Sequence, residues 1–281
     1  MEVAVVGHVE WIEFGRVDRV PAPGDIAHAV DVRHEPGGAG AVAAVQLAKL
    51  AGGCTLFTAL GDDDVGGRMR RELGRLGVRV EAMLRDEPTR RAVTMIDDDG
   101  ERTILTLGDR LHPVAADPLP WNELERASAA FFTAGDADAL RRARAARVLV
   151  ATSRMMDTLA EADARLDAVV GSAGDPAERY DPVALSHPPG VVVSTEGAEG
   201  GRYLTAAGIE GRYPGVPAPG PVVDTYGAGD SFMGGLTYAL GKRMALPRAL
   251  DLAARCGAAS VTGSGPYERQ LTAEDVRDVP V

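Results

Sequence analysis

The sequence predicts an α/β fold in three layers, with a mainly parallel sheet flanked by helices and a small β-sheet lid. Hydrophobic residues make up 45% of the 281 residues, which is enough for a sizeable core. Short, continuous apolar runs such as Val3–Val6 are typical of strands buried on both faces of a parallel sheet. In the second half of the chain, expected strands alternate with expected helices, which implies parallel βαβ units. The length fits one α/β domain spanning residues 1–281 with a small appendage.

The first third of the chain combines buried elements with a more open sheet. After the strand Val3–Val6, residues 10–35 alternate polar and apolar positions, which predicts short antiparallel strands with one open face. Residues 41–50 are rich in Ala and Leu and predict a buried helix that ends at the glycines 52–53. A strand over 55–60 follows.

Acidic residues at 62–64 open the next helix, where they suit the positive helix N-terminus. Residues 91–107 alternate strongly and predict a β-hairpin with Asp99 and Gly100 in its turn. We expect this hairpin to join the strands of residues 10–35, so that about 10–35 and 86–108 form the lid.

The later elements follow the strand-and-helix alternation. Strands are expected at 129–133, 148–151, 168–170 and 191–195, with a helix at 136–146 between the first two. Residues 205–213 predict a further hairpin.

Charge and cysteine content narrow the functional classes. The net charge of −11 argues against a general nucleic-acid binder and against an anionic-membrane binder, although a local basic pocket remains compatible with it. Cys54 and Cys256 lie far apart in apolar surroundings, so we expect no disulfide and a reducing cytoplasm. The N-terminal residues resemble a strand more than a signal peptide, and no apolar stretch reaches the length of about 18 residues of a membrane span.

The segment 224–230 has the sequence Asp-Thr-Tyr-Gly-Ala-Gly-Asp and leads into an expected helix at 232–240. A glycine-containing loop that enters a helix collects unpaired backbone N–H groups and the positive end of the helix dipole, so it is suited to binding phosphate. Gly227 and Gly229 would let the backbone approach a phosphate closely. Asp230 could act as a general base that takes the proton of a substrate hydroxyl, or it could simply cap the helix.

This motif resembles the C-terminal signature of the ribokinase-like (PfkB) carbohydrate kinases. The resemblance implies an ATP-dependent kinase that phosphorylates a hydroxyl of a small carbohydrate-like substrate, such as a sugar, a sugar acid or a nucleoside. It assigns Asp230 as the catalytic base and Gly227, Ala228 and Gly229 as the anion hole for the transferred phosphoryl group.

Further motifs extend the resemblance over nearly the whole chain. Gly37 and Gly38 are similar to the family's Gly-Gly substrate motif, and Pro23-Gly24-Asp25 is similar to its lid motif. The family pattern places ATP along Thr195, Gly197 and Gly200. Two further residues predicted to contact the nucleotide are Thr225 and Gly257.

The chain departs from the family pattern at positions that usually bind sugar hydroxyls. The usual Asp is Ile12 and the usual Asn is Val42, with Glu10 and Glu13 flanking Ile12. We therefore predict that Glu10, together with Gly37 and Gly38, contacts the substrate, and that typical ribose or fructose substrates are doubtful.

The family's Asn-x-x-Glu motif, which is tied to Mg²⁺, falls on residues 172–175. Asp175 then takes the place of Glu as the metal-associated carboxylate, and Ser172 takes the place of Asn. Arg154 is predicted either to contact a phosphate or an acidic substrate, or to form a surface ion pair. The five histidines show no metal-ligand spacing.

Two other readings compete with an active kinase. Residues 38–43 satisfy a Gly-x-Gly-x-x-Ala pattern, but the polar, Pro-terminated segment before them argues against a dinucleotide site. The departures at Ile12, Val42 and Ser172 would suit a ribokinase-fold binding or regulatory protein that has lost catalysis. For either protein we expect a small-molecule ligand, no nucleic acid or membrane partner, and a homodimer through the open lid sheet.

Overall fold

The computed structural model describes residues 1–97 and 102–277. Their strands form a nine-stranded sheet in the order β13-β12-β11-β10-β9-β8-β1-β4-β5 and a four-stranded sheet in the order β3-β2-β6-β7. The strands are β1 Val3–Val6, β2 Glu10–Arg16, β3 Val30–Gly37, β4 Cys54–Gly61, β5 Val78–Arg85, β6 Arg91–Ile96, β7 Arg102–Leu107, β8 Ala129–Phe132, β9 Leu149–Thr152, β10 Ala168–Ser172, β11 Val191–Thr195, β12 Gly200–Thr205 and β13 Glu210–Pro214. The α-helices are α1 Ala39–Ala51, α2 Asp64–Arg75, α3 Ala137–Ala143, α4 Met156–Ala162, α5 Ala228–Gly241 and α6 Leu246–Ser260, and the 3₁₀ helices are η1 Trp121–Arg126, η2 Ser153–Met155, η3 Pro176–Glu178 and η4 Gly197–Glu199.

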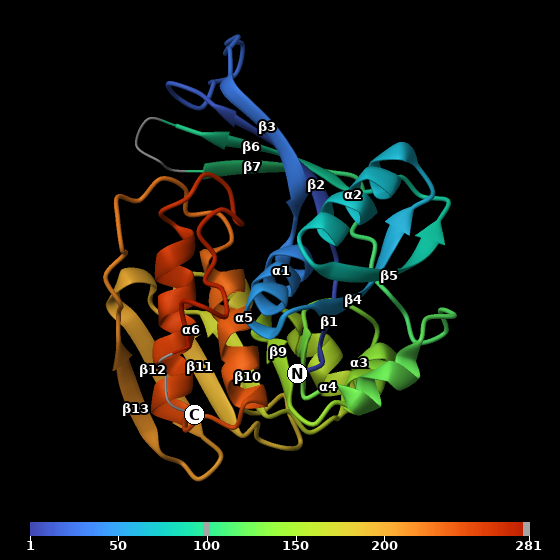
Figure 1. Cartoon of the computed structure of the whole chain (residues 1–281), viewed down its shortest axis with the longest axis vertical. Helices are drawn as coiled ribbons and strands as arrows, with labels where there is room; N and C mark the ends of the chain where they lie inside the picture. The colour runs from blue at the N-terminus through green and yellow to red at the C-terminus, as the bar shows by residue number, and fades with distance from the viewer. Residues whose placement is uncertain (98–101, 278–281) are drawn as a thin grey trace.

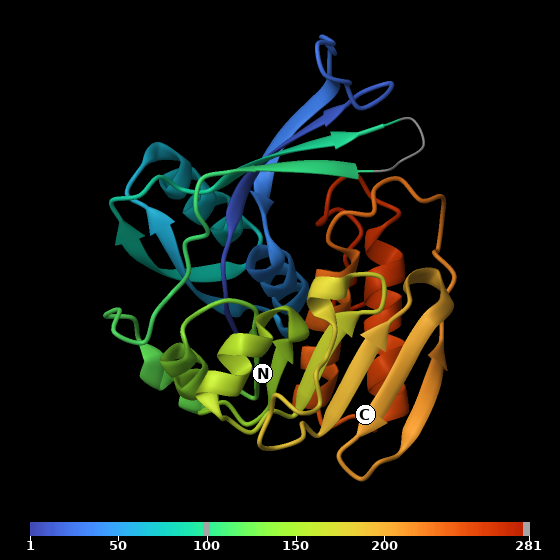
Figure 2. The same ribbon diagram turned by 180° about the vertical axis from the view of Figure 1, so that it is seen from behind.

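The large sheet is the middle layer of three, as predicted. Strand β1 is wholly buried and pairs in parallel with β4 on one side and β8 on the other. Helices α1, α5 and α6 cover one face (Figure 1), and α3 and α4 cover the other (Figure 2). Each face has its own apolar core, and burial of these side chains is the main stabilising contribution to the fold.

The lid is the four-stranded sheet. Strand β2 pairs antiparallel with β3 and parallel with β6, and β6 pairs antiparallel with β7. Strands from residues 10–37, 91–96 and 102–107 therefore share one small sheet, as the alternating pattern predicted. Figures 1 and 2 show this sheet extending across one end of the large sheet, above the ends of α1 and α5. The predicted turn residues Asp99 and Gly100 lie outside the described residues.

Three elements differ from the sequence predictions. Strand β5 was not predicted, because as an edge strand it mixes exposed charged residues with buried Val78 and Val80. The C-terminal hairpin begins at Gly200 instead of 205, since its first strand starts with two glycines that conceal a strand pattern. Helix α5 begins at Ala228, four residues earlier than expected, because Gly227 adopts a left-handed conformation (φ 79°) and serves as its N-cap.

The helices and the two cysteines bear on the predictions about membrane spans and disulfides. None of the helices in residues 1–97 and 102–277 combines the length and apolar character needed to cross a bilayer. Cys54 and Cys256 are both buried free thiols.

Candidate active site

The segment 224–230, called the phosphate loop below, is anchored through its first residue. The carboxylate of Asp224 is almost completely buried and accepts hydrogen bonds from the amides of Tyr226 (2.9 Å) and Gly265 (3.2 Å). Its second oxygen also accepts a 2.5 Å bond from Arg33 of lid strand β3. The chain then turns at Gly227 into α5. This loop is therefore tied to both the lid and the chain beyond α6.

The N-terminus of α5 offers free amides. The first intrahelical hydrogen bond runs from the amide of Ser231 to the carbonyl of Gly227 (2.8 Å). The amides of Gly229 and Asp230 come before Ser231 in the chain, so they take no part in the intrahelical bonds. A Cβ placed on Gly229 would meet no atom within 4 Å, whereas one on Gly227 would lie 2.9 Å from side-chain carbons of Val42 and Pro266. Gly229 thus faces open space at a positive helix end, which is the geometry of an anion site.

Asp230 lies in the first turn of α5, as predicted. Desolvation, followed by the negative charge of Glu178, raises the pKa of its carboxyl to about 6, even though the positive charge of Arg102 acts in the opposite direction. A carboxylate with this pKa is ionised at neutral pH and is a stronger base than an ordinary Asp. No hydrogen bond from the described residues to its carboxylate competes with a substrate hydroxyl, so the arrangement permits proton abstraction.

The predicted substrate residues gather beside this loop. Gly37 ends β3 and Gly38 is the N-cap of α1, with φ 81°. The amide of Gly38 donates a 2.9 Å hydrogen bond to the hydroxyl of buried Tyr226, the variable residue of the motif. Glu10 is buried, and its Cγ would lie 3.4 Å from a Cβ on Gly38. Tyr226 therefore joins the two glycine motifs, a role that its position in the sequence did not reveal.

The two positions that depart from the family pattern are packing residues. Ile12 is fully buried, and its Cδ1 lies 2.1 Å from where a Cβ on Gly37 would be. Val42 is equally buried, and its side chain packs against Gly227, where an added Cβ would lie 2.9 Å from Cγ1 of Val42. Hydrocarbon side chains thus occupy both places and hold the glycine backbones, and neither can bind a hydroxyl.

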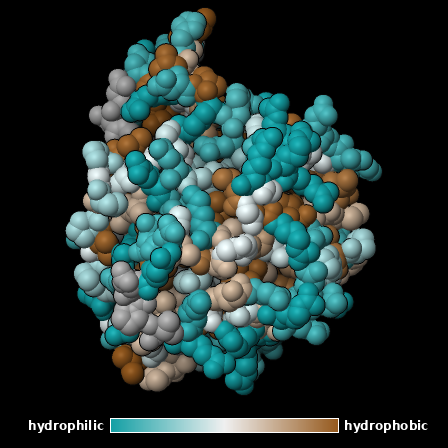
Figure 3. Space-filling view, in the orientation of Figure 1, coloured by the Kyte–Doolittle hydropathy of each residue, from teal (hydrophilic) through white to brown (hydrophobic). Residues whose placement is uncertain are grey.

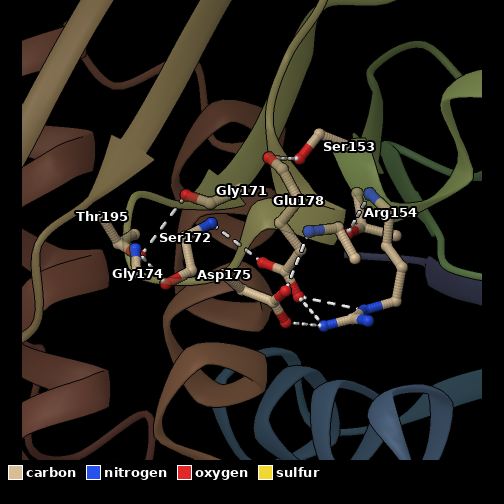
Figure 4. Close-up of polar contacts among 10 residues, drawn as sticks. Ser153, Arg154, Gly171, Ser172, Gly174, Asp175, Glu178 and Thr195 are labelled. Carbon is tan, nitrogen blue, oxygen red and sulfur yellow. Dashed lines mark hydrogen bonds and ion pairs between the residues drawn. The ribbon is translucent and has the colours of Figure 1, made fainter.

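Arg154 lies among acidic residues at the carboxyl ends of β9 and β10 (Figure 4). Its Nη2 is 2.8 Å from the carboxylate of Glu178 and forms a second ion pair with Asp175. The other oxygen of Glu178 accepts a 2.8 Å bond from the amide of Ser172. Asp175 also accepts from the amide of Ala177, and both contacts lower the pKa of its carboxyl.

Glu178 was not among the predicted site residues. It lies three residues beyond the expected end of the motif, and only the turn through η3 brings it back to Ser172. Within residues 1–97 and 102–277, no group of three or more His, Cys, Asp or Glu side chains is arranged to hold a metal ion. Carboxylate oxygens are nevertheless the ligands that Mg²⁺ prefers, and it needs only one or two from protein when phosphates supply others.

The predicted nucleotide residues lie on β11, η4, β12, α6 and the phosphate loop. Thr195 ends β11, directly opposite Ser172 of β10, and Gly197 begins η4 with φ 61°. Gly200 has φ 90°, and a Cβ there would lie 2.2 Å from the carbonyl oxygen of Tyr213, so this glycine is required by the hairpin itself. On the far side of the phosphate loop, Gly257 of α6 packs against the carbonyl of Ala228 (3.2 Å from an added Cβ). Thr225 accepts from Arg102 of β7 through its carbonyl (2.7 Å).

Comparison with known proteins decides the family. The model of the pfkB family carbohydrate kinases matches residues 1–147 and 116–273. The chain belongs to the PfkB family of carbohydrate kinases. It is therefore a phosphotransferase of the sugar-kinase type, and its fold is the ribokinase-like fold.

Relatives of this PfkB protein have several substrates in their names. An ATP-dependent ribose-1-phosphate kinase of Halopiger xanaduensis is 29% identical over 94% of this chain and 93% of its own length. An aminoimidazole riboside kinase of Salmonella typhimurium is 30% identical over 84% and 86%.

Solved structures agree on the fold. A putative ribokinase from Agrobacterium tumefaciens superposes with a TM-score of 0.84 at 20% identity, covering 99% of this chain and 96% of its own. Arabidopsis thaliana ribokinase, complexed with ribose and ATP, superposes with a TM-score of 0.78 at 22% identity, covering 98% and 97%.

Proposed function

We propose that this chain is an ATP-dependent kinase that phosphorylates a hydroxyl of a small carbohydrate-like substrate, which is a sugar, a sugar acid or a nucleoside. The observation that carries the proposal is the carboxyl of Asp230, which has a raised pKa in the first turn of α5, beside the open amide of Gly229. The relatives named above are ATP-dependent or act on ribose derivatives, which supports the same reaction class.

The chain's own groups supply two parts of the reaction. The carboxylate of Asp230 takes the proton of the substrate hydroxyl, whose oxygen forms a bond to the γ-phosphorus while the bond from phosphorus to the ADP oxygen breaks. The amides of Gly227, Ala228 and Gly229, with the helix dipole behind them, are assigned to stabilise negative charge on the transferring group; the amide of Ala228 makes a long contact of 3.5 Å with the carbonyl of Thr225, and that of Gly229 is free among the described residues. The proton remains on Asp230 until product leaves.

The nucleotide is proposed to lie between η4 and α6. Its phosphates would extend from Thr195, Gly197 and Gly200 toward Thr225 and the phosphate loop, with the adenine near Gly257. When Mg²⁺ is bound, it neutralises phosphate charge, and Asp175 and Glu178 are the carboxylates that could hold it. Arg154 pairs with both carboxylates, so it would keep them oriented toward that position.

A panel assay tests the proposal. ADP release should be measured with ATP and Mg²⁺ over pentoses, hexoses, aldonic acids, nucleosides and sugar phosphates. Turnover with one class would support the kinase. Tight binding of a compound without any ADP release across the panel would favour the alternative, a ribokinase-fold binding or regulatory protein. The packing side chains Ile12 and Val42 favour that alternative, and the intact Asp230 opposes it.

The lid sheet is proposed to pair with a second copy of this chain. Its edge strands expose large apolar side chains that lack cover in the described residues: Val30, Val32, Ile104, Leu105 and Leu107. Figure 3 shows apolar surface among hydrophilic surface on the projecting part of the molecule. Light scattering after gel filtration should give a dimer mass, and Val32→Lys with Leu105→Lys should give a monomer. A monomer mass for the unaltered chain at all concentrations would rule the dimer out.

A further inference from the structure

Positively charged side chains from separate segments converge at the substrate end of the site. Arg90 precedes β6, Arg110 follows β7, and Arg154 lies on η2 after β9; these three are called the arginine cluster below. They lie within electrostatic reach of one another, because the positive charges of Arg90 and Arg154 lower the pKa of Arg110, in addition to the effect of its desolvation. Holding like charges together is unfavourable unless something negative joins them.

The carboxylates around the cluster leave several of its donors free. Nε of Arg90 lies 3.0 Å from Glu10, but outside hydrogen-bonding geometry. Arg110 has no hydrogen bond or ion pair from its guanidinium to any described residue. Arg154 uses Nε and Nη2 on Glu178 and Asp175, which leaves Nη1 without a partner in the described part of the chain.

Buried polar atoms at the same place also lack partners. Nδ1 of His8 and Nε of Arg90 are both buried without a hydrogen bond among the described residues. Burial, followed by the positive charges of Arg110 and Arg90, lowers the pKa of His8 to about 3, so its imidazole is neutral. A buried unpaired group costs roughly 1–3 kcal/mol, and folded proteins contain few of them. Two such groups near each other show that the described residues do not fully satisfy the polar side chains next to the arginine cluster.

This cluster borders the proposed reaction centre. His8 Cδ2 would lie 3.4 Å from a Cβ on Gly38, at the same distance as the Cγ of Glu10. The charges of Glu10 and Arg154 both act on the carboxyl of Asp230. A molecule that places a hydroxyl on Asp230 and lies over Gly38 therefore extends toward these arginines.

We propose that the substrate carries an anionic group, a phosphate or a carboxylate, which binds Arg90 and Arg110 beside His8, with Arg154 between this group and Asp230. The inference rests on the proposed kinase function and specifies its substrate class. Guanidinium groups match the planar, multidentate acceptors of phosphate and carboxylate. A neutral sugar would leave the exposed guanidinium of Arg110, within the described part of the chain, with solvent as its only partner. The protein's net charge of −11 would repel an anion, so a local cationic site is needed to capture one.

Matched substrate pairs test the inference. ADP release should be compared for a pentose and its phosphate monoester, and for an aldose and its aldonic acid. We expect kcat/KM to be at least about 100-fold higher for the anionic member of one pair, and the preferred pair distinguishes phosphate from carboxylate. Arg110→Ala should lower kcat/KM for that compound by roughly 10- to 100-fold and leave the neutral partner unchanged. Arg91→Ala is the control, because Arg91 adjoins Arg90 but pairs with Glu13.

A binding measurement separates this inference from the kinase proposal. Calorimetric titration of the preferred anionic compound into the Asp230→Asn protein needs no turnover, and adding Arg110→Ala should weaken the affinity by the same roughly 10- to 100-fold. Equal kcat/KM for neutral and anionic partners, with no effect of Arg110→Ala, would show that the cluster is only a structural ion-pair network, while the kinase proposal stands. Absence of ADP release with every compound would remove the kinase proposal, and calorimetry with each neutral and anionic pair in turn would still decide the anion site.

Discussion

The two halves of the site are built in different ways. The phosphate half is one continuous stretch of backbone, residues 224–230, which enters α5 and presents amides to open space. The proposed substrate half consists of side chains from separate segments, such as His8, Glu10 and the arginine cluster. A backbone anion site depends on a local conformation, whereas a side-chain site depends on the whole fold bringing distant segments together.

This difference has a chemical meaning. A transferring phosphoryl group is the same in every reaction of this type, so amides and a helix dipole suffice to stabilise it. Substrates differ, and side chains are the part of a site that can change without altering the backbone. Ile12 and Val42 illustrate this, since both fill the places of hydroxyl-binding groups while the glycine loops keep their form. The predictions below test how sharply the two halves are separated.

The largest expected effect belongs to the proposed base. Asp230→Asn keeps the shape of the side chain but cannot take a proton, so kcat should fall by roughly 10²- to 10⁴-fold. Affinity for ATP, measured by calorimetry, should change little, because the nucleotide is proposed to contact other residues. Normal turnover by this variant would make Asp230 a helix cap and not a base.

A pair of glycine variants tests whether the phosphate loop acts through open space. Gly229→Ala adds a methyl group that meets no protein atom and suits a helix, so the fold should be stabilised by about 0.5–1 kcal/mol. The same methyl group would occupy the position proposed for the phosphoryl group, so kcat/KM should fall by roughly 10- to 100-fold.

Gly227→Ala should destabilise the fold, whereas Gly229→Ala should stabilise it. Its φ of 79° and its contact with Val42 would cost the fold about 1–2 kcal/mol or more, measurable as a lower Tm. If Gly229→Ala retained full activity, the anion hole would have to lie elsewhere.

Prediction from sequence succeeded where signals are local. The parallel strands are continuous apolar runs, and the lid strands alternate, so both sheets could be predicted. Edge strand β5 was not predicted, because its buried and exposed residues do not alternate regularly. The onset of α5 was misplaced because a glycine at positive φ can start a helix without any side-chain cap.

The site divides in the same way. Asp230 and its glycines are adjacent in the sequence, so a motif was enough to propose them as site residues. Tyr226 and Glu178 could not be proposed from a motif. Tyr226 occupies the variable position of its motif, and Glu178 lies beyond the end of the motif at residues 172–175. Arg90 and Arg110 occur in a chain with many arginines, and only the folded lid and loops bring these two near each other and near Glu10.

The pH dependence should report the environment of Asp230. Below its pKa of about 6 the carboxyl is protonated and cannot accept the substrate proton, so kcat/KM should fall about tenfold per pH unit there and level off above it. The negative charge of Glu178 raises this pKa, so Glu178→Gln should move the midpoint to lower pH. The measured quantity is the pH of the midpoint, because Glu178→Gln leaves the carboxyl of Asp230 in place and changes only the charge near it. An unchanged midpoint would mean that another group controls the profile.

The smallest expected effect concerns the contact between the halves. Arg33 of the lid donates to buried Asp224 at 2.5 Å and lies over the ring of Phe14 at 4.3 Å, so it connects the lid to the start of the phosphate loop. Arg33→Met keeps the apolar contact and removes the charge. Since Asp224 retains two amide donors and Arg33 is partly solvated, the loss of stability should be only about 1–2 kcal/mol. Arg19→Met, which removes an exposed lid ion pair with Asp25, should leave Tm unchanged. If the kcat of Arg33→Met falls as well, the lid helps to position the phosphate loop; if only Tm falls, the two halves work independently once folded.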